Sequence, residues 1–241
     1  MASSTIVVVA GNCDDVSVKN LIKKYFANVP VSKKSSKKRV VEKQTKPEIL
    51  LFPKLSEQTH LVLGVRAFPA NDKRASTLSV LNAILGEGMS SRLFRNLRES
   101  LGICYYVRSS FDEYTDHGVL EISSGVDPKR SLMAVGAICD ELKRFKNELV
   151  TDDELQKAKE YMIGAMYLGL ETSDALAGFY GFEEVVRHAT KSPKDIEKAI
   201  RSVTAREIQK VARDIIKDNR LNLVMVGKVP DKREVKRILK I

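Results

Sequence analysis

The sequence predicts an α+β fold, a two-layer sandwich in which helices pack on one face of a largely antiparallel sheet. Short apolar runs bounded by turn residues fill the first half of the chain, and residues 105–114 and 118–126 form the pattern of an antiparallel hairpin. The second half carries amphipathic helices with capping residues instead. Strands followed by a run of helices are typical of α+β domains.

The composition is that of an ordinary globular protein, with 43% hydrophobic and 30% charged residues in 241 positions. No apolar run approaches the roughly 18 residues of a membrane span, so we expect no membrane partner. The cysteines Cys13, Cys104 and Cys139 are odd in number and widely spaced, which argues against a disulfide framework or a structural zinc site. With no signal-peptide pattern at the N-terminus, we expect a cytoplasmic location.

The net charge of +10 raises the question of nucleic-acid binding. Residues 32–39, SKKSSKKR, concentrate part of this charge but contain no aromatic side chain on which a base could stack. The other basic residues lie beside Glu and Asp along predicted helices, as on a solvated surface. We therefore expect no nucleic-acid partner, while attraction of acidic peptides or of a negatively charged partner stays open.

The sequence pattern of the first 47 residues indicates a region separate from the rest of the chain. Residues 5–10 have the pattern of a buried strand, and a helix capped by Asn12, Asp14 or Asp15 follows it. A strand and one helix cannot make a core of their own. Residues 31–47 lack an apolar face and predict a basic linker.

Further elements follow in a regular order. The predicted strands are residues 48–53, 59–68, 105–114, 118–126 and 221–227. The predicted helices are residues 73–85, 92–101, 128–145, 173–186 and 231–240, together with helices that begin at the capping boxes of Thr151 and Thr204 and at Pro193.

The two ends of the chain resemble each other. Each has an apolar strand, a glycine (Gly11 or Gly227), a short acidic turn and a helix with a Val-Lys pair. Such an internal repeat indicates one whole unit preceded by the last strand and helix of another. We therefore predict three parts: residues 1–30 from a preceding homologous domain, the linker 31–47, and a domain over 48–241.

Residues 86–106 hold the candidate site. Gly86 and Gly88 predict a glycine-rich loop in which the chain turns sharply, and Ser90 or Ser91 can cap the next helix. Leu93, Leu97 and Leu101 are expected to face inward at four-residue spacing. No Lys-Ser or Lys-Thr follows the second glycine, so a phosphate-binding P-loop is a poor fit.

Arg98, near the end of this helix, and Tyr105, near the start of the next strand, lie at one helix–strand corner. A guanidinium and a phenol hydroxyl are donors suited to backbone carbonyls or carboxylates. An extended peptide at a sheet edge presents such carbonyls at regular spacing. The plain alternative is that Arg98 pairs with Glu99 near the helix C-terminus and that Tyr105 only packs.

The stretch GMSSRLFRNLRESLGICYYV resembles the signature of the second, non-catalytic domain in the pitrilysin/insulinase family of inverted-zincin peptidases, which includes mitochondrial processing peptidase. The matching parts are Ser-Arg-Leu-Phe, Leu-Arg-Glu and Gly-Ile-Cys-Tyr, with Ile103 in place of the usual Leu. The likeness extends over nearly the whole chain. It implies that Arg98 and Tyr105 bind the backbone of a peptide substrate close to a zinc ion held by a partner.

That zinc is expected in a homologous partner domain or subunit that carries His-x-x-Glu-His, because this chain has no such motif. Its histidines, His60, His117 and His188, lie far apart in sequence. The resemblance thus implies a substrate-holding half of a metalloendopeptidase, with no metal site or catalytic residue of its own, inactive alone and able to form a homo- or heterodimer. The alternative is a structural or interaction subunit of the same fold with no peptidase role.

Overall fold

The computed structural model describes residues 2–33 and 36–241 and contains one five-stranded sheet, in the order β1-β5-β2-β4-β3. β1 pairs with β5 in parallel, and the other neighbours are antiparallel. The strands are β1 (Glu48–Pro53), β2 (Thr59–Ala67), β3 (Cys104–Glu113), β4 (Gly118–Val126) and β5 (Leu221–Gly227).

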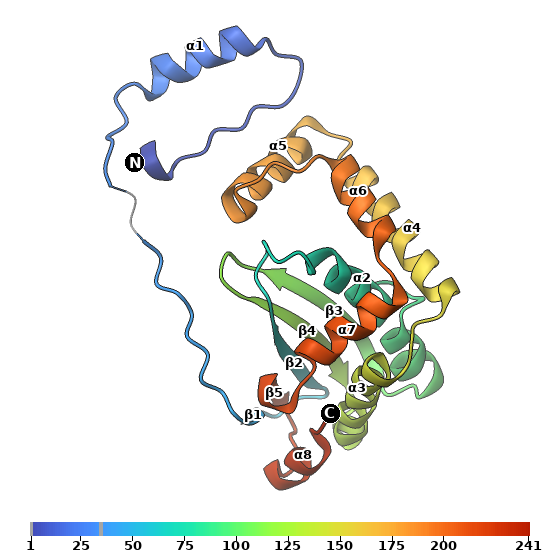
Figure 1. Cartoon of the computed structure of the whole chain (residues 1–241). Coiled ribbons are helices and arrows are strands. Elements are labelled where there is room, and N and C mark those ends of the chain that lie inside the picture. The colour runs from blue at the N-terminus through green and yellow to red at the C-terminus, as the bar shows by residue number, and fades with distance from the viewer. Residues whose placement is uncertain (1, 34–35) are drawn as a thin grey trace.

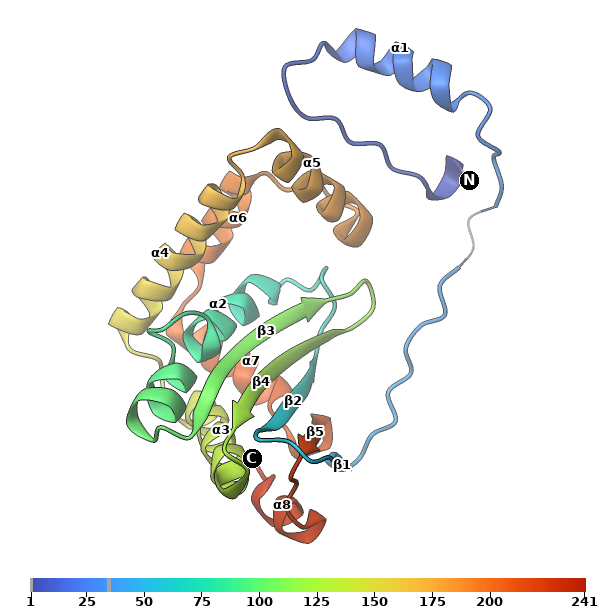
Figure 2. The same cartoon turned by 180° about the vertical axis from the view of Figure 1, so that it is seen from behind.

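Helices cover one face of this sheet and leave the other open (Figures 1 and 2), which confirms the predicted two-layer fold. The α-helices are α1 (Asp15–Phe26), α2 (Ala75–Gly86), α3 (Ser131–Asn147), α4 (Asp152–Gly169), α5 (Ser173–Phe182), α6 (Pro193–Ser202), α7 (Ala205–Ile215) and α8 (Lys232–Ile238). Short helical turns are η1 (Ala2–Ser4), η2 (Phe94–Ser100), η3 (Pro128–Arg130), η4 (Glu183–Arg187) and η5 (Asp218–Arg220). Among the residues described, none of these helices is long and apolar enough to cross a bilayer.

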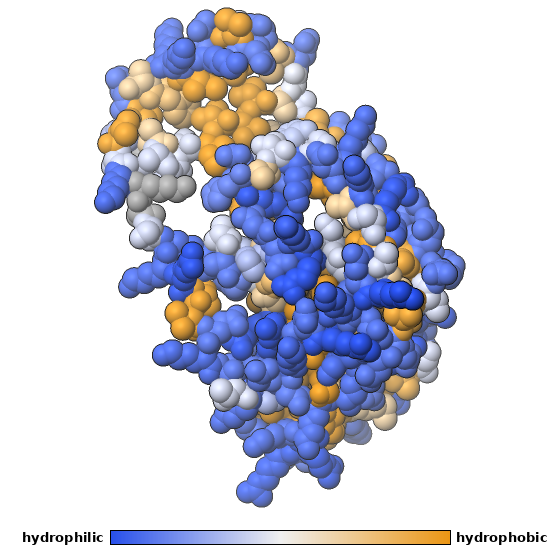
Figure 3. All heavy atoms as spheres, in the orientation of Figure 1, coloured by the Kyte–Doolittle hydropathy of each residue, from blue (hydrophilic) through white to orange (hydrophobic). Residues whose placement is uncertain are grey.

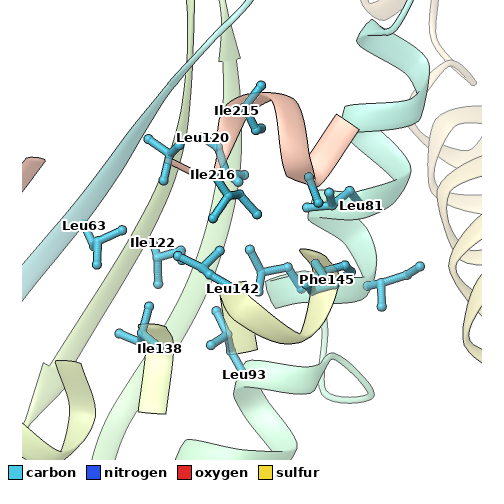
Figure 4. Packing of buried hydrophobic residues seen from close by; sticks show 14 of the residues in the cluster. Leu63, Leu81, Leu93, Leu120, Ile122, Ile138, Leu142, Phe145, Ile215 and Ile216 are labelled. Carbon is cyan, nitrogen blue, oxygen red and sulfur yellow. The ribbon is translucent and has the colours of Figure 1, made fainter. Parts of the chain in front are cut away.

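The core lies between the sheet and the helices that cover it. Leu63 and Ile122 point from the strands toward Leu142 and Phe145 of α3, and all four are fully buried (Figure 4). Alternation along β2 buries every second side chain, as a sheet with one covered face requires. The capping boxes predicted at Thr151 and Thr204 are both present, so these helices begin where the sequence indicates.

The N-terminal region departs from prediction in one element. Helix α1 forms as predicted, with Asp14 accepting a hydrogen bond from the Ser17 amide, but residues 5–10 form no strand. A strand requires a neighbouring strand, and this segment runs between α1 and α5 instead of along a sheet (Figures 1 and 2).

The same region exposes much apolar surface, which gathers beside α1 in Figure 3. The exposed residues are Ile6, Val7, Val9, Val16, Leu21, Tyr25 and Phe26. α5 is also apolar, yet it has no fully buried residue. One side of residues 5–10 touches it, since the Val8 side chain lies 3.6 Å from where a Cβ on Gly181 would be.

The internal repeat predicted for the chain ends has a counterpart in backbone conformation. Gly11 has φ +136° and Gly227 has φ +134°, values that side chains rarely allow. At Gly227 there is also no space for a side chain, because an added Cβ would lie 2.7 Å from the Gln58 carbonyl oxygen. At Gly11 the nearest atom to an added Cβ is the Ser173 hydroxyl at 3.6 Å, so Gly11 has the same conformation without the same packing.

The predicted linker has no helix or strand over residues 36–47, but it is tied to the end of the sheet; two residues of its basic run, 34 and 35, lie outside the described part. Asp116, at the tip of the β3–β4 hairpin, accepts hydrogen bonds from Lys37 Nζ at 2.8 Å and from the Val40 amide at 3.0 Å. Further along, Glu42 pairs with Arg66 at 3.2 Å, and Gln44 donates to the Leu221 carbonyl at 2.8 Å.

Asp116 binds Lys37 and Val40, at the N-terminal end of this part of the linker, as an ionised carboxylate. Lys37, then His117 and the Val40 amide, lower the pKa of its carboxyl because each donates to the charged form. His117 Nδ1 lies 2.9 Å from Asp116 Oδ1, and the His117 ring stacks on Tyr114. The hairpin tip is therefore built around this one carboxylate.

We predict that Asp116→Ala releases residues 37–40 and speeds tryptic cleavage after Lys37, Lys38 and Arg39 by roughly tenfold, since limited proteolysis follows local opening. The measurement is the cleavage rate at each bond by mass spectrometry. Asp127→Ala is the matched control, because Asp127 caps a turn before α3 and touches no linker residue among those described. Equal rates in both variants would show that the linker is not held by Asp116.

Candidate functional site

The candidate site begins where α2 ends against the edge strand β3. An added Cβ on Gly86 would lie 2.5 Å from Ser109 Oγ and 2.6 Å from Ser109 N, so only glycine allows this approach. Gly88 instead supplies the turn, with φ +77°. The predicted glycine-rich loop is thus corrected: Gly86 is the last residue of a helix packed on the sheet, and Gly88 alone has the left-handed conformation.

A buried arginine anchors the helical segment that follows the turn. Arg92 binds Glu154 through two hydrogen bonds of 2.7 and 2.9 Å, and its guanidinium lies 4.5 Å from the ring centre of Phe145. Its hydrogen bonds, together with the Thr151 amide of the capping box, lower the pKa of Glu154 to about 2 against the cost of burial. The turn is tied in the same way, since Ser91 Oγ donates to the Gly88 carbonyl at 2.7 Å.

The helix itself is wound differently from the predicted α-helix. Residues Phe94–Ser100 form a π-helix, in which the Leu101 amide donates to Asn96, five residues back. Leu93 and Leu97 are fully buried, as expected, but Leu101 is 40% exposed. Its predicted inward position was wrong because a wider turn rotates it off the row, and Ile103 fills the core after Gly102, whose φ is +59°.

Arg98 and Tyr105 meet at the corner where this helix leads into β3. The Arg98 guanidinium donates to the Tyr105 carbonyl oxygen and lies 5.4 Å from the ring centre of Phe94. No carboxylate pairs with Arg98 among residues 2–33 and 36–241, so the alternative in which it pairs with Glu99 does not hold. Its charge and most of its N–H donors face solvent.

A β-bulge gives Tyr105 its exposure. Cys104 pairs with Val126 and Tyr106 pairs with Gly125, so Tyr105 is an extra residue without a partner on β4. Its side chain is 56% exposed, which excludes a role in core packing. Because β3 is an edge strand, the side of Tyr105 away from β4 is open to a ligand. The structure brings the two predicted residues together; their role as substrate ligands stays a prediction.

Sequence reasoning missed the neighbouring pair on the open face of the sheet. The Tyr106 hydroxyl lies 3.1 Å from His60 Nδ1 on β2, across Gly125 of β4. An added Cβ on Gly125 would lie 2.5 Å from the Tyr106 ring. A glycine within a strand indicates such a close approach, so Gly125 could have predicted this contact from the sequence. No sequence pattern, by contrast, predicts the β-bulge at Tyr105.

The donor groups in residues 2–33 and 36–241 do not fit a zinc ion. Within the part of the chain that the structure describes, no three His, Cys, Asp or Glu residues are grouped so as to hold a metal. His60 contacts Tyr106, His117 contacts Asp116, and His188 ends η4. Burial raises the pKa of the Cys139 thiol to about 11 and also raises that of Cys104, so neither thiol is a ready ligand.

Comparison with known proteins gives the family context. The family model described as the peptidase M16 inactive domain matches residues 2–162. An uncharacterized zinc protease of Streptomyces coelicolor is 30% identical over 94% of this chain and 50% of its own length. One from Bacillus subtilis is 30% identical over 89% of this chain and 52% of its own. The chain therefore spans about half the length of these relatives.

Solved structures share the fold at lower identity. A protease from Helicobacter pylori has a TM-score of 0.81 at 22% identity, covering 90% of this chain and 53% of its own. A chain of complex III2 from Candida albicans has a TM-score of 0.79 at 14% identity, covering 96% of this chain and 57% of its own.

We predict that Arg92→Met lowers the free energy of unfolding by about 2–3 kcal/mol at pH 7, because it leaves Glu154 partly buried without its partner. The folded-state pKa of Glu154 is depressed, so the pair stabilises above the unfolded pKa near 4.5 and its contribution is lost as pH falls toward 2. The difference between variant and parent, measured by urea unfolding, should shrink over that window.

Lys157→Met is the matched control for this experiment. Lys157 pairs with Asp153 at 2.7 Å on the same helix, but both side chains are exposed. Such a pair contributes about 0–1 kcal/mol. Equal losses for the two variants would contradict the anchoring role of Arg92.

We predict that Gly86→Ala destabilises the fold by about 1–3 kcal/mol, because the methyl group collides with the β3 backbone at Ser109. Gly164→Ala is its control: Gly164 lies exposed within α4 with no atom within 4 Å of an added Cβ, so alanine there should stabilise by about 0.5–1 kcal/mol. Chemical unfolding of both variants measures the contrast. A neutral Gly86→Ala would show that helix and strand can separate without cost.

Proposed function

Because this chain belongs to the peptidase M16 family, we propose that it is the substrate-holding, non-catalytic half of a zinc-dependent metalloendopeptidase, opposite a zinc site supplied by another domain or chain. The observation that carries the proposal is the pairing of Arg98 with Tyr105 at an exposed bulge on an edge strand. There the Arg98 guanidinium has no carboxylate partner among the described residues, and the neighbouring Tyr105 side chain is exposed.

The chemistry of this corner suits an extended peptide. β3 has unpaired backbone groups along its outer side, to which a peptide can add as a further strand. Arg98, already oriented by the Tyr105 carbonyl, keeps N–H donors free for a substrate carbonyl, and the Tyr105 hydroxyl offers another. Neither group needs to gain or lose a proton in this role; they hold and orient the peptide. Such positioning can lower a reaction barrier by several kcal/mol in favourable cases.

The partner we propose is a homologous domain or subunit that carries the zinc motif. Two features of residues 2–30 support it. Gly11 repeats the conformation of Gly227, which follows β5, and the apolar side chains of this region are exposed although the sequence has the pattern of a buried strand and helix. Docked as the counterpart of β5, residues 5–10 would lie between a parallel and an antiparallel neighbour within the partner's sheet.

A second candidate function is that of a structural subunit without peptidase activity. The complex III2 chain from Candida albicans has this fold, and a relative from Bacillus subtilis, 23% identical, is named a probable inactive metalloprotease. The exposed apolar surface of residues 5–26 serves assembly equally well. The two candidates differ in whether Arg98 and Tyr105 affect turnover.

The deciding measurement is cleavage of an unstructured peptide mixture with zinc present, read by mass spectrometry. We expect no cleavage by this chain alone and cleavage once the His-x-x-Glu-His half is added. A stable complex without cleavage would favour the structural subunit, and cleavage by the chain alone would contradict the assignment of chemistry to the partner.

In that assembly, Arg98→Ala and Tyr105→Phe should each lower kcat/KM by about tenfold or more, because each removes a donor to the substrate backbone. Arg206→Ala, an exposed arginine on α7, and Tyr167→Phe, an exposed tyrosine on α4 that contacts Glu197, are the matched controls and should leave turnover unchanged. Unfolding midpoints must stay at the parental value in all four variants. Unchanged turnover in the first pair would remove the assigned roles.

A further inference from the structure

We propose that this site prefers peptides that carry a carboxylate next to the held backbone, either an acidic side chain or the peptide's own C-terminus. This inference rests on the proposed function and names the substrate class for the same corner. It comes from two further arginines: Arg108, three residues along β3 from Tyr105, and Arg130, which contacts the carbonyl oxygens of Leu101 and Gly102.

Arg108 stands on the edge strand itself, three residues after Tyr105. Val107 and Ser109, its neighbours along β3, are buried toward the helices, so Arg108 faces the open side of the sheet. Its Nε donates to Ser123 Oγ on β4 at 3.2 Å, and its two terminal nitrogens have no hydrogen-bond partner among the described residues.

Arg130 approaches the other end of the corner. It belongs to η3, which precedes α3, and its Nη1 lies 3.3 Å from the Gly102 carbonyl oxygen and 3.5 Å from that of Leu101. These carbonyls follow η2 directly, so Arg130 lies beside the residues that connect Arg98 to Tyr105. The chain thus places two guanidinium groups, those of Arg98 and Arg130, at the start of β3 and a third, that of Arg108, at the middle of the strand.

Arg98, Arg108 and Arg130 differ from the arginines that stabilise the fold in having no carboxylate partner among the described residues. Arg92, Arg74 and Arg187 each have a carboxylate within 3 Å. Arg98, Arg108 and Arg130 make no ion pair among residues 2–33 and 36–241, although each has a hydrogen bond or contact that fixes its position. Positioned guanidinium groups without a carboxylate partner are what a site for a carboxylate ligand requires.

Acidic groups near the corner do not remove this charge. Asp127 accepts a hydrogen bond from the Lys129 amide at 2.9 Å and caps the turn of η3. Glu99 is exposed and forms no ion pair with any residue that the structure describes. Glu121 and Asp112 lie further along the hairpin, beyond Arg108. With Lys129 added, the start of β3 carries three positive groups (Arg98, Lys129 and Arg130) against two negative ones (Glu99 and Asp127).

The geometry of a bound strand brings a carboxylate to these groups. Side chains of an extended peptide alternate between the two faces of the sheet that it joins. A peptide added to β3 at Tyr105 would therefore direct one side chain toward Arg108 on the open face. Its end, or the next side chain, would lie toward Arg98 and Arg130. Because the site is exposed, we expect a modest and salt-dependent preference.

The test is binding of labelled unstructured peptides to the 241-residue chain, measured by fluorescence anisotropy at low and at high salt. Four peptides of one length are compared: neutral and amidated, neutral with a free C-terminus, amidated with two Glu residues, and amidated with two Lys residues. We expect the Glu peptide or the free C-terminus to bind about three- to tenfold more tightly than the neutral amide at low salt, with the gain lost at high salt. Which of the two binds more tightly identifies the source of the carboxylate.

In the double variant Arg108→Gln, Arg130→Gln, the carboxylate-bearing peptides should bind no more tightly than the neutral amide, a ratio of about one. Their tighter binding should persist in Arg206→Gln, which removes one positive charge from α7. Equal binding of all four peptides, or a gain that survives in the double variant, would overturn the inference. If the neutral amide binds and depends on Arg98 while acidic peptides gain nothing, the holding function stands and only the carboxylate preference fails. If no peptide binds, both fail.

Discussion

The candidate site depends on the ion pair between Arg92 and Glu154. Glu154 is the third residue of α4 and closes its capping box, so one carboxylate both starts that helix and holds η2. Because Arg92 is buried between Glu154 and the Phe145 ring, the helical segment after it has little freedom to rotate. The position of Arg98, six residues later, follows from this anchor. If more residues separated Arg98 from the buried Arg92, the Arg98 guanidinium would be freer to move, and its contact with the Tyr105 carbonyl would be weaker.

Irregular backbone geometry then turns this anchored corner outward. The π-helix places Leu101 in solvent and shifts the end of the segment, and the bulge at Tyr105 adds a residue to β3 without a partner on β4. Each irregularity removes regular hydrogen bonds and is retained only where the surrounding packing fixes it. Gly86 supplies that packing, because its lack of a Cβ lets α2 rest on the β3 backbone at Ser109. Core and site are thus built from the same few contacts.

Most regular elements could be predicted from the sequence because their signals are local. Capping boxes, strand alternation and the hairpin depend on neighbours within a few residues, and β1, β4 and β5 lie where the pattern indicates. The failures have a non-local cause. Residues 5–10 have strand character but find no neighbouring strand, Leu101 follows a π-helix that no spacing rule encodes, and the partners of Asp116 come from a segment that reads as a free linker. Arg98 and Tyr105 could be proposed from the sequence because one short segment contains both, whereas Arg108 and Arg130 enter our proposal only through their contacts with Ser123 of β4 and with the Gly102 carbonyl.

The contacts of the linker bear on how a partner would reach the corner. Residues 37–44 follow the end of the sheet from Asp116 to Leu221, so the chain before them leaves the domain at the hairpin tip and not at β1. If residues 2–30 dock in a partner's sheet, that partner is tethered at the tip of β3, the same edge strand that carries Tyr105. A tether at β1 would attach the partner at the opposite edge of the sheet. Fixing the linker at Asp116 therefore places the tether beside β3, at the end of the strand opposite Tyr105, on the edge to which we propose that a peptide adds.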